Sequence, residues 1–137
     1  MKKVTGRCLC GAVTYSAQLK ESRLVACHCG MCQQWTGGAT VTTTPVNSIE
    51  FTGEDCIQYF AASSLVERGF CSVCGSNLVF RETTETATKI SICSGTLDDA
   101  AGFELWIEIF VDSKARGYSF SGDHQRLTEA EFLELIA

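Results

Sequence analysis

The chain of 137 residues has little proline, few histidines and no linker-like stretch. Pro45 is its only proline, and no internal repeat, low-complexity tract or segment rich in proline, glycine or serine interrupts it. A length near 140 residues with no such boundary is typical of one folding unit. We therefore expect a single domain that spans residues 1–137.

Basic residues are also scarce, and no long apolar run is present. The chain has 11 Lys and Arg against 16 Asp and Glu, which gives a net charge of -5. Phosphate contacts require Lys or Arg, so the composition argues against a nucleic-acid partner or an anionic membrane surface. The longest apolar candidate, residues 105–111, is interrupted by Glu108 and is far shorter than the roughly 20 residues that cross a bilayer. No apolar run follows Met1-Lys2-Lys3 as a signal peptide would require, so we expect a cytoplasmic protein.

Cysteine, in contrast, is abundant. The chain has nine cysteines, an odd number, and in a reducing cytosol these are metal ligands or buried thiols more naturally than disulfides. Cys56 and Cys93 lie within strand-like patterns, where we expect them to be small buried apolar residues. The remaining seven form three short clusters, which predicts two zinc ions per chain.

Two of the clusters together predict a closed site. Cys8-x-Cys10 and Cys71-x-x-Cys74 are each followed by glycine, as expected where the backbone turns tightly. Each pair is half of a tetrahedron, and four thiolates complete a structural zinc site. The alternative is a set of unrelated buried thiols.

The remaining cluster predicts an open site. Cys27, Cys29 and Cys32 supply three thiolates and leave a fourth position for water or a reactant, so we interpret them as the ligands of a catalytic zinc. His28 is an alternative fourth ligand, but the residue between two ligands in extended backbone points the opposite way. We expect His124, in a polar loop, to be solvated. An iron-sulfur cluster is a weaker alternative, because neither Rieske nor four-cysteine ferredoxin spacing is present.

A thiol is the best-matched fourth ligand for an open zinc site of this kind. Zinc deprotonates a bound thiol, whose free pKa is about 8.5, and three protein thiolates leave that sulfur electron-rich. The site therefore favours addition of a thiolate to a small electrophile over hydrolysis.

Local patterns predict a mainly β fold of short antiparallel strands with a short C-terminal helix. Thr128 and Glu131 have the spacing of a capping box, which predicts a helix over 128–136. We expect its apolar residues Phe132, Leu133, Leu135 and Ile136 to dock on the sheet, and a second helical turn within 27–35. The expected strands, which alternate with period two, are 11–17, 39–44, 48–52, 56–60, 65–70, 77–81, 89–93 and 104–111.

Over about residues 6–115, the chain resembles the glutathione-dependent formaldehyde-activating enzyme family, also called the GFA or centromere protein V domain family. The segments that carry the resemblance are Cys8-Leu9-Cys10-Gly11-Ala12-Val13, Cys27-His28-Cys29-Gly30-Met31-Cys32, Thr36-Gly37, Phe70-Cys71-Ser72-Val73-Cys74-Gly75-Ser76 and, more weakly, Ser94-Gly95-Thr96-Leu97-Asp98-Asp99.

The resemblance implies an Mss4-like β-tent with the same two zinc sites and carbon-sulfur lyase activity. The namesake reaction joins glutathione to formaldehyde and gives S-hydroxymethylglutathione, so the implied partner is glutathione or a similar small thiol or thiol adduct. Mss4-type relatives bind proteins instead, and a non-catalytic, zinc-stabilised binding module is the alternative.

Some residues have open or unusual roles. Gln33-Gln34 and Glu108 stand where the family often has a basic residue and a histidine, which implies a change in the substrate pocket. Trp35 and Phe70 fit pocket walls and core packing equally well. Asp98-Asp99 fits a turn or cap better than an acid-base role.

Overall fold

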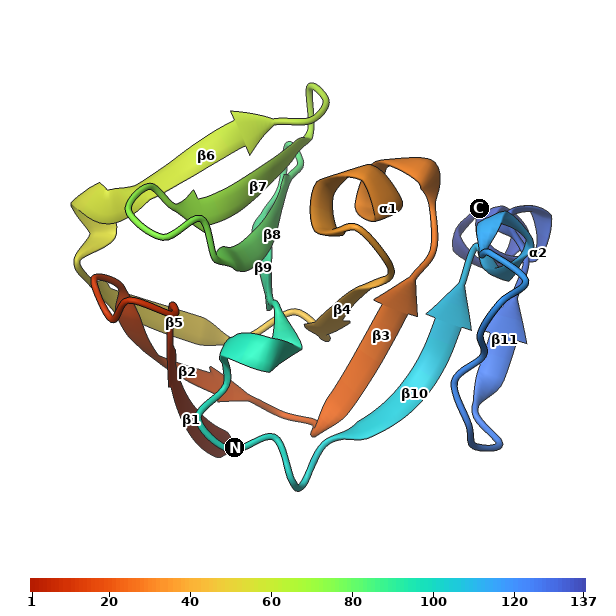
Figure 1. Cartoon of the computed structure of the whole chain (residues 1–137), viewed down its shortest axis with the longest axis horizontal. Helices are drawn as coiled ribbons and strands as arrows, with labels where there is room; N and C mark the ends of the chain where they lie inside the picture. Colours follow the sequence, from red (N-terminus) through yellow and green to blue (C-terminus); the bar gives the residue numbers. More distant parts are fainter.

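In the computed structural model, which describes residues 1–137, the strands form three small sheets (Figure 1). Sheet A has the order β1-β2-β5, sheet B the order β11-β10-β3-β4, and sheet C the order β6-β7-β8-β9. Sheet A comprises β1 (Lys2–Arg7), β2 (Thr14–Leu19) and β5 (Ser48–Thr52); sheet B comprises β3 (Arg23–Cys27), β4 (Thr40–Thr43), β10 (Glu104–Ile109) and β11 (Gln125–Leu127). Sheet C comprises β6 (Ile57–Ala61), β7 (Val66–Cys71), β8 (Asn77–Thr83) and β9 (Thr88–Ile92). The two α-helices are α1 (Gly30–Thr36) and α2 (Glu129–Ile136). Short 3-10 helices cover Glu54–Cys56, Ser94–Thr96 and Val111–Ser113.

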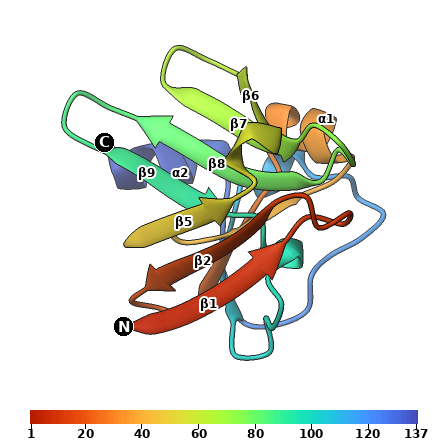
Figure 2. The same cartoon turned by 90° about the vertical axis from the view of Figure 1, so that its left-hand side faces the viewer.

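Two apolar clusters pack sheets A and C together. In β2, Tyr15, Ala17 and Leu19 alternate with more exposed residues and pack with Ile92 of β9, because successive side chains of a strand point to opposite faces. Figure 2 shows sheets A and C side by side at this junction. The second cluster contains two cysteines of the predicted closed site, and its buried members are Cys8, Val13, Cys71, Leu78 and Val79.

The mainly β fold is confirmed, with two differences in detail. The sequence patterns missed the strands β1, β3 and β11. In addition, β10 pairs in parallel with both β3 and β11, so sheet B is mixed and not purely antiparallel. Parallel neighbours are joined by long connections, and no local pattern reports such a pairing.

The C-terminal helix forms as predicted but docks less than expected. The Thr128 side chain accepts from the Glu131 backbone N-H, and the Glu131 side chain accepts from the Thr128 N-H, which completes the capping box. Phe132 is half-buried and lies 5.8 Å from the Phe110 ring. Leu135 and Ile136 remain 64% and 62% exposed, so the predicted broad apolar contact is wrong for that part of the helix.

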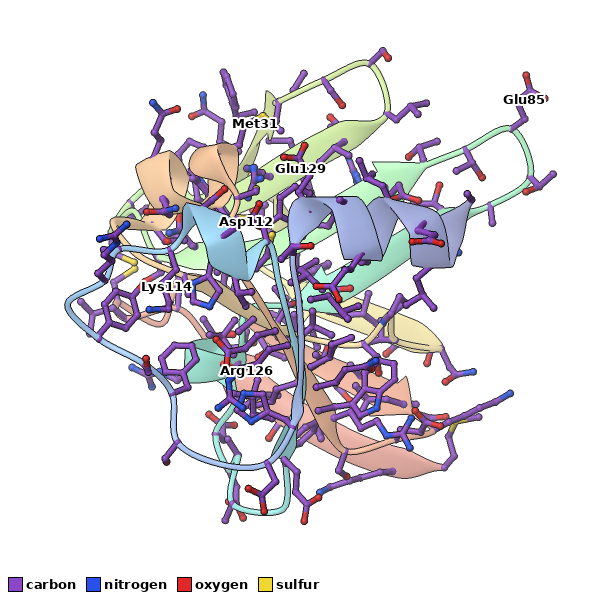
Figure 3. The ribbon with its side chains drawn as sticks, turned by 90° about the vertical axis from the view of Figure 1, so that its right-hand side faces the viewer. Met31, Glu85, Asp112, Lys114, Arg126 and Glu129 are labelled. Carbon is purple, nitrogen blue, oxygen red and sulfur yellow. The ribbon has the colours of Figure 1, made fainter.

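The turn after β10 fixes where this helix begins. The backbone N-H of Glu129 donates to a carboxylate oxygen of Asp112 at 3.0 Å, and Figure 3 shows the two residues close together. Neither helix is long and apolar enough to cross a membrane.

Candidate metal centres

The four-cysteine cluster has the dimensions of a tetrahedral metal site. The Sγ atoms of Cys8, Cys10, Cys71 and Cys74 all lie within 4.8 Å of one another. The Cys8–Cys10 and Cys10–Cys71 sulfur distances are 3.7 and 3.8 Å. A tetrahedron with zinc-sulfur bonds of about 2.3 Å has edges of about 3.8 Å. These residues therefore fit a metal ion of that size.

Two similar turns bring the four sulfurs together. The N-H of Gly11 donates to the Cys8 carbonyl at 3.2 Å, and the N-H of Gly75 donates to the Cys71 carbonyl at 2.8 Å. Both glycines have φ near +80°, which a residue with a side chain rarely adopts. The first turn follows β1 and the second follows β7, so the cluster joins sheet A to sheet C.

Ser76 links these two turns, a role that the cysteine spacing did not reveal. Its hydroxyl accepts from the Leu9 N-H in the first turn at 3.0 Å and lies 3.2 Å from Cys74 Sγ in the second. The contact with Ser76 is the main reason that the pKa of Cys74 falls to about 5. A lowered pKa favours the thiolate, which is the form that binds metal.

The three-cysteine cluster is built where β3 passes into α1. Cys27 ends the strand, Cys29 is the N-cap residue of the helix, and Cys32 lies in its first turn. The three Sγ atoms lie within 4.8 Å of one another, and the Cys32 N-H donates to Cys29 Sγ at 3.4 Å. This local geometry confirms the helical turn that the sequence predicted.

A cavity of about 360 Å³ lies against this cluster, and Cys27, Cys29 and Cys32 all line it. Its walls are mostly apolar and include Phe80 from β8 and Phe132 from α2. The four-cysteine cluster does not line it. The two clusters could each hold a metal ion, and the three-cysteine cluster alone borders this cavity.

A hydrogen bond between Cys27 and Cys32 shifts the pKa values of these two thiols in opposite directions. The hydrogen bond from Cys27 lowers the pKa of Cys32 to about 5, and smaller contributions come from Thr40 and Arg68. The same hydrogen bond raises the pKa of Cys27. The two directions favour a thiolate at Cys32 over one at Cys27.

His28 lies outside the metal cluster, as strand alternation predicted. Its side chain is fully buried, and Nε2 donates to Glu108 Oε1 at 2.7 Å. The expectation that His124 is solvated was wrong: its side chain is 4% exposed and binds the other oxygen of Glu108. Arg126 Nε lies 3.1 Å from that same oxygen, and Figure 3 labels Arg126 on β11.

Comparison with known proteins identifies the family of this chain. A family model described as glutathione-dependent formaldehyde-activating enzyme matches residues 3–113. The chain belongs to this family. A protein of Schizosaccharomyces pombe named as an uncharacterized lyase is 25% identical over 136 residues, which cover 99% of this chain and 98% of that protein.

A solved structure extends the family comparison at the level of fold alone. The crystal structure of a Rhodobacter sphaeroides protein aligns with a TM-score of 0.56 at 15% identity. The alignment covers 89% of this chain and 98% of the other. The arrangement of small sheets therefore recurs in a protein of quite different sequence.

The departures from the family pattern have structural roles. Gln33 Nε2 donates to the backbone carbonyls of His28 and Ser113 at 2.6 and 2.8 Å. It therefore links the three-cysteine segment, residues 27–32, to the turn after β10. Glu108 accepts the hydrogen bond from His28 that is described above. Neither Gln33 nor Glu108 lines the cavity at the three-cysteine cluster.

The residues with open roles are now placed. Trp35 and Phe70 line a separate surface hollow and do not line the cavity at the three-cysteine cluster. Asp99 accepts from the Ala101 N-H at 2.9 Å in a turn, and Asp98 accepts from the Thr5 hydroxyl.

The two cysteines outside the clusters lie in the protein interior to different extents. Cys93 is buried, and burial raises its pKa to about 12, whereas Cys56 is half-buried against the second apolar cluster.

Proposed function

We propose that this protein is a zinc-dependent lyase that acts on the carbon-sulfur bond of a small thiol adduct. The observation that carries the proposal is the cavity beside Cys27, Cys29 and Cys32, a cluster with one ligand fewer than a closed tetrahedral site. Membership of the glutathione-dependent formaldehyde-activating enzyme family and a relative named as a lyase support it.

We assign different roles to the two clusters. Cys8, Cys10, Cys71 and Cys74 would hold a structural zinc ion, and Cys27, Cys29 and Cys32 would hold a catalytic one, giving two zinc ions per chain. The catalytic ion would supply a thiolate at neutral pH, because bound zinc deprotonates a thiol. The protein's own thiolates would fix the ion, and the apolar walls would keep bulk water from the reacting groups.

The reaction is the reversible addition of a thiol to a carbonyl carbon. In the forward direction the carbon-sulfur bond forms and the thiol proton passes to the carbonyl oxygen. In the lyase direction the bond breaks and releases thiol and aldehyde. Glutathione is the thiol in the family's name, and we propose it or a similar small thiol as the reactant, in the cytoplasm.

Cobalt substitution tests the proposal directly. Cobalt in a thiolate site absorbs visible light, and the spectrum changes when a further sulfur binds. We expect added thiol to alter the spectrum of the wild-type protein but not that of Cys27→Ser. An unchanged wild-type spectrum would remove the lyase proposal and favour a binding module whose two zinc ions are both structural.

Metal analysis of cysteine variants tests the division of roles. We expect two zinc ions in the wild type and one in Cys27→Ser, which should stay folded by circular dichroism. Cys71→Ser should unfold, because structural zinc contributes on the order of 10 to 16 kcal/mol in zinc-finger peptides. Equal loss of structure in both variants would contradict separate catalytic and structural sites.

A further inference from the structure

Arg68 on β7 is a buried cation beside the three-cysteine cluster. It is 2% exposed, and its Nη2 donates to Cys32 Sγ at 3.6 Å. The guanidinium carbon lies 5.0 Å from the centroid of the Trp35 ring and 5.2 Å from that of Phe80. It forms no salt bridge with any Asp or Glu of the chain.

One edge of this guanidinium has no protein partner. Arg68 Nη1 is buried and makes no hydrogen bond, whereas the contact with Cys32 accounts for Nη2 alone. An unsatisfied buried donor costs about 1 to 3 kcal/mol, and more when it is charged. No contact within the folded chain offsets that cost at Nη1. A bound anion that accepts a hydrogen bond from Nη1 would offset it.

The cavity that Arg68 lines contains few other charged residues. Arg68 is the only Lys, Arg or His among the residues that line it, and Glu82 is the only acid. The rest of the cavity lining is largely apolar and includes Val66, Phe110 and Ile136. A volume of about 360 Å³ lies at the small end of ligand pockets, which span roughly 300 to 1,000 Å³.

We propose that Arg68 binds the carboxylate of the substrate, and that the substrate is a small, mainly apolar thiol acid or its aldehyde adduct. This deepens the proposed function and rests on it for the role of the sulfur. A planar guanidinium suits a carboxylate because two N-H groups can face two oxygens. Glutathione carries a second carboxylate, for which the cavity offers no second cation.

A matched pair of thiol-free probes isolates the carboxylate contact. We would titrate the zinc-loaded full-length protein with 4-methylpentanoate and with its neutral amide by isothermal titration calorimetry. We expect the carboxylate to bind at least about tenfold more tightly than the amide, as is typical of charge-assisted hydrogen bonds. Equal affinities in the wild type would overturn the proposal without any mutation.

Two variants locate the effect at Arg68. Arg68→Met, whose folding circular dichroism would check, should lose the preference for the carboxylate. Arg68→Lys should keep part of it. Arg81→Met is the control, since Arg81 pairs with Glu67 and does not line the cavity. A preference that survives in Arg68→Met would place the carboxylate elsewhere and overturn the proposal.

The cobalt protein separates this inference from the proposed function. We expect 3-mercaptopropionate to alter the spectrum at a lower concentration than its neutral amide or glutathione does. A spectrum that glutathione alters as readily would overturn the substrate class but leave the lyase standing. An Arg68-dependent carboxylate preference with no thiol-induced spectral change would support the anion site and remove the lyase.

Discussion

Glu108 is a buried carboxylate with three basic neighbours, one of which, His28, lies within the three-cysteine segment, residues 27–32. It is 1% exposed and contacts His28, His124 and Arg126. Burial raises the pKa of Glu108, but the hydrogen bonds from His124 and His28 outweigh it and hold the pKa below its ordinary value. Because His28 lies between Cys27 and Cys29, this network fixes the backbone that carries two of the thiolates.

Glu108→Ala tests the strength of this network. We expect the free energy of unfolding to fall by about 3 to 5 kcal/mol, because the change leaves buried basic groups without their partner. Guanidinium unfolding of the zinc-loaded protein at pH 7 measures it. Glu104→Ala, at an exposed position of the same strand, should change stability by less than about 0.5 kcal/mol. Similar losses in the two variants would show that the network contributes little.

The sequence predicted which thiols gather but not what surrounds them. Cysteine spacing is a local signal, and two or three sulfurs on one turn follow from it directly. Arg68 reaches Cys32 across 36 positions, and Glu108 reaches His28 across 80. Contacts between such distant positions depend on sheet pairing, which no local pattern encodes. His124 was misplaced for the same reason.

Among the elements, α2 was the most predictable because its signals are local. A Thr and a Glu three positions apart are sufficient to define its beginning. The sequence did not reveal how far the helix docks, since that depends on where the other elements leave a surface. The strand β3 was missed because it pairs with β4 on one side and β10 on the other, and its residues do not alternate clearly in burial.

The capping box of α2 gives a pH-dependent prediction. Hydrogen bonds from Thr128 hold the pKa of Glu131 below its ordinary value, so its contribution to stability is present above the unfolded-state pKa and is lost as pH falls through the folded-state pKa. We expect Glu131→Gln to loosen α2 at pH 7, with a difference from wild type that narrows toward pH 4.

NMR chemical shifts of the α2 backbone would measure this effect. Glu134→Gln, on the same helix but outside the box, is the matched control. A Glu131→Gln effect of the same size at pH 7 and pH 4 would mean that the ionised carboxylate is not what stabilises the helix.

At the scale of the whole molecule, the two clusters occupy different positions. The four-cysteine cluster joins sheets A and C, whereas the three-cysteine cluster lies at the end of β3 in sheet B. β7 connects them, because it carries both Arg68 and Cys71. We propose on this basis that the chain is a single cooperative domain.

Chemical unfolding followed by two probes tests that proposal. Trp106 in β10 reports on sheet B, and Trp35 in α1, 5.0 Å from Arg68 of β7, reports on the contact of α1 with sheet C, while far-ultraviolet circular dichroism reports on all three sheets. We expect both signals of the zinc-loaded protein to change at the same denaturant concentration. Separate midpoints would divide the chain into independently stable parts.

The spacing of the clusters also bears on how the protein is made. Cys29 and Cys32 are 3 positions apart, whereas Cys10 and Cys71 are separated by 61. Closing the longer loop costs about 2 to 3 kcal/mol more in chain entropy. During translation the shorter cluster is also synthesised before Cys71. A nascent chain can therefore complete the three-cysteine cluster first and the four-cysteine cluster later.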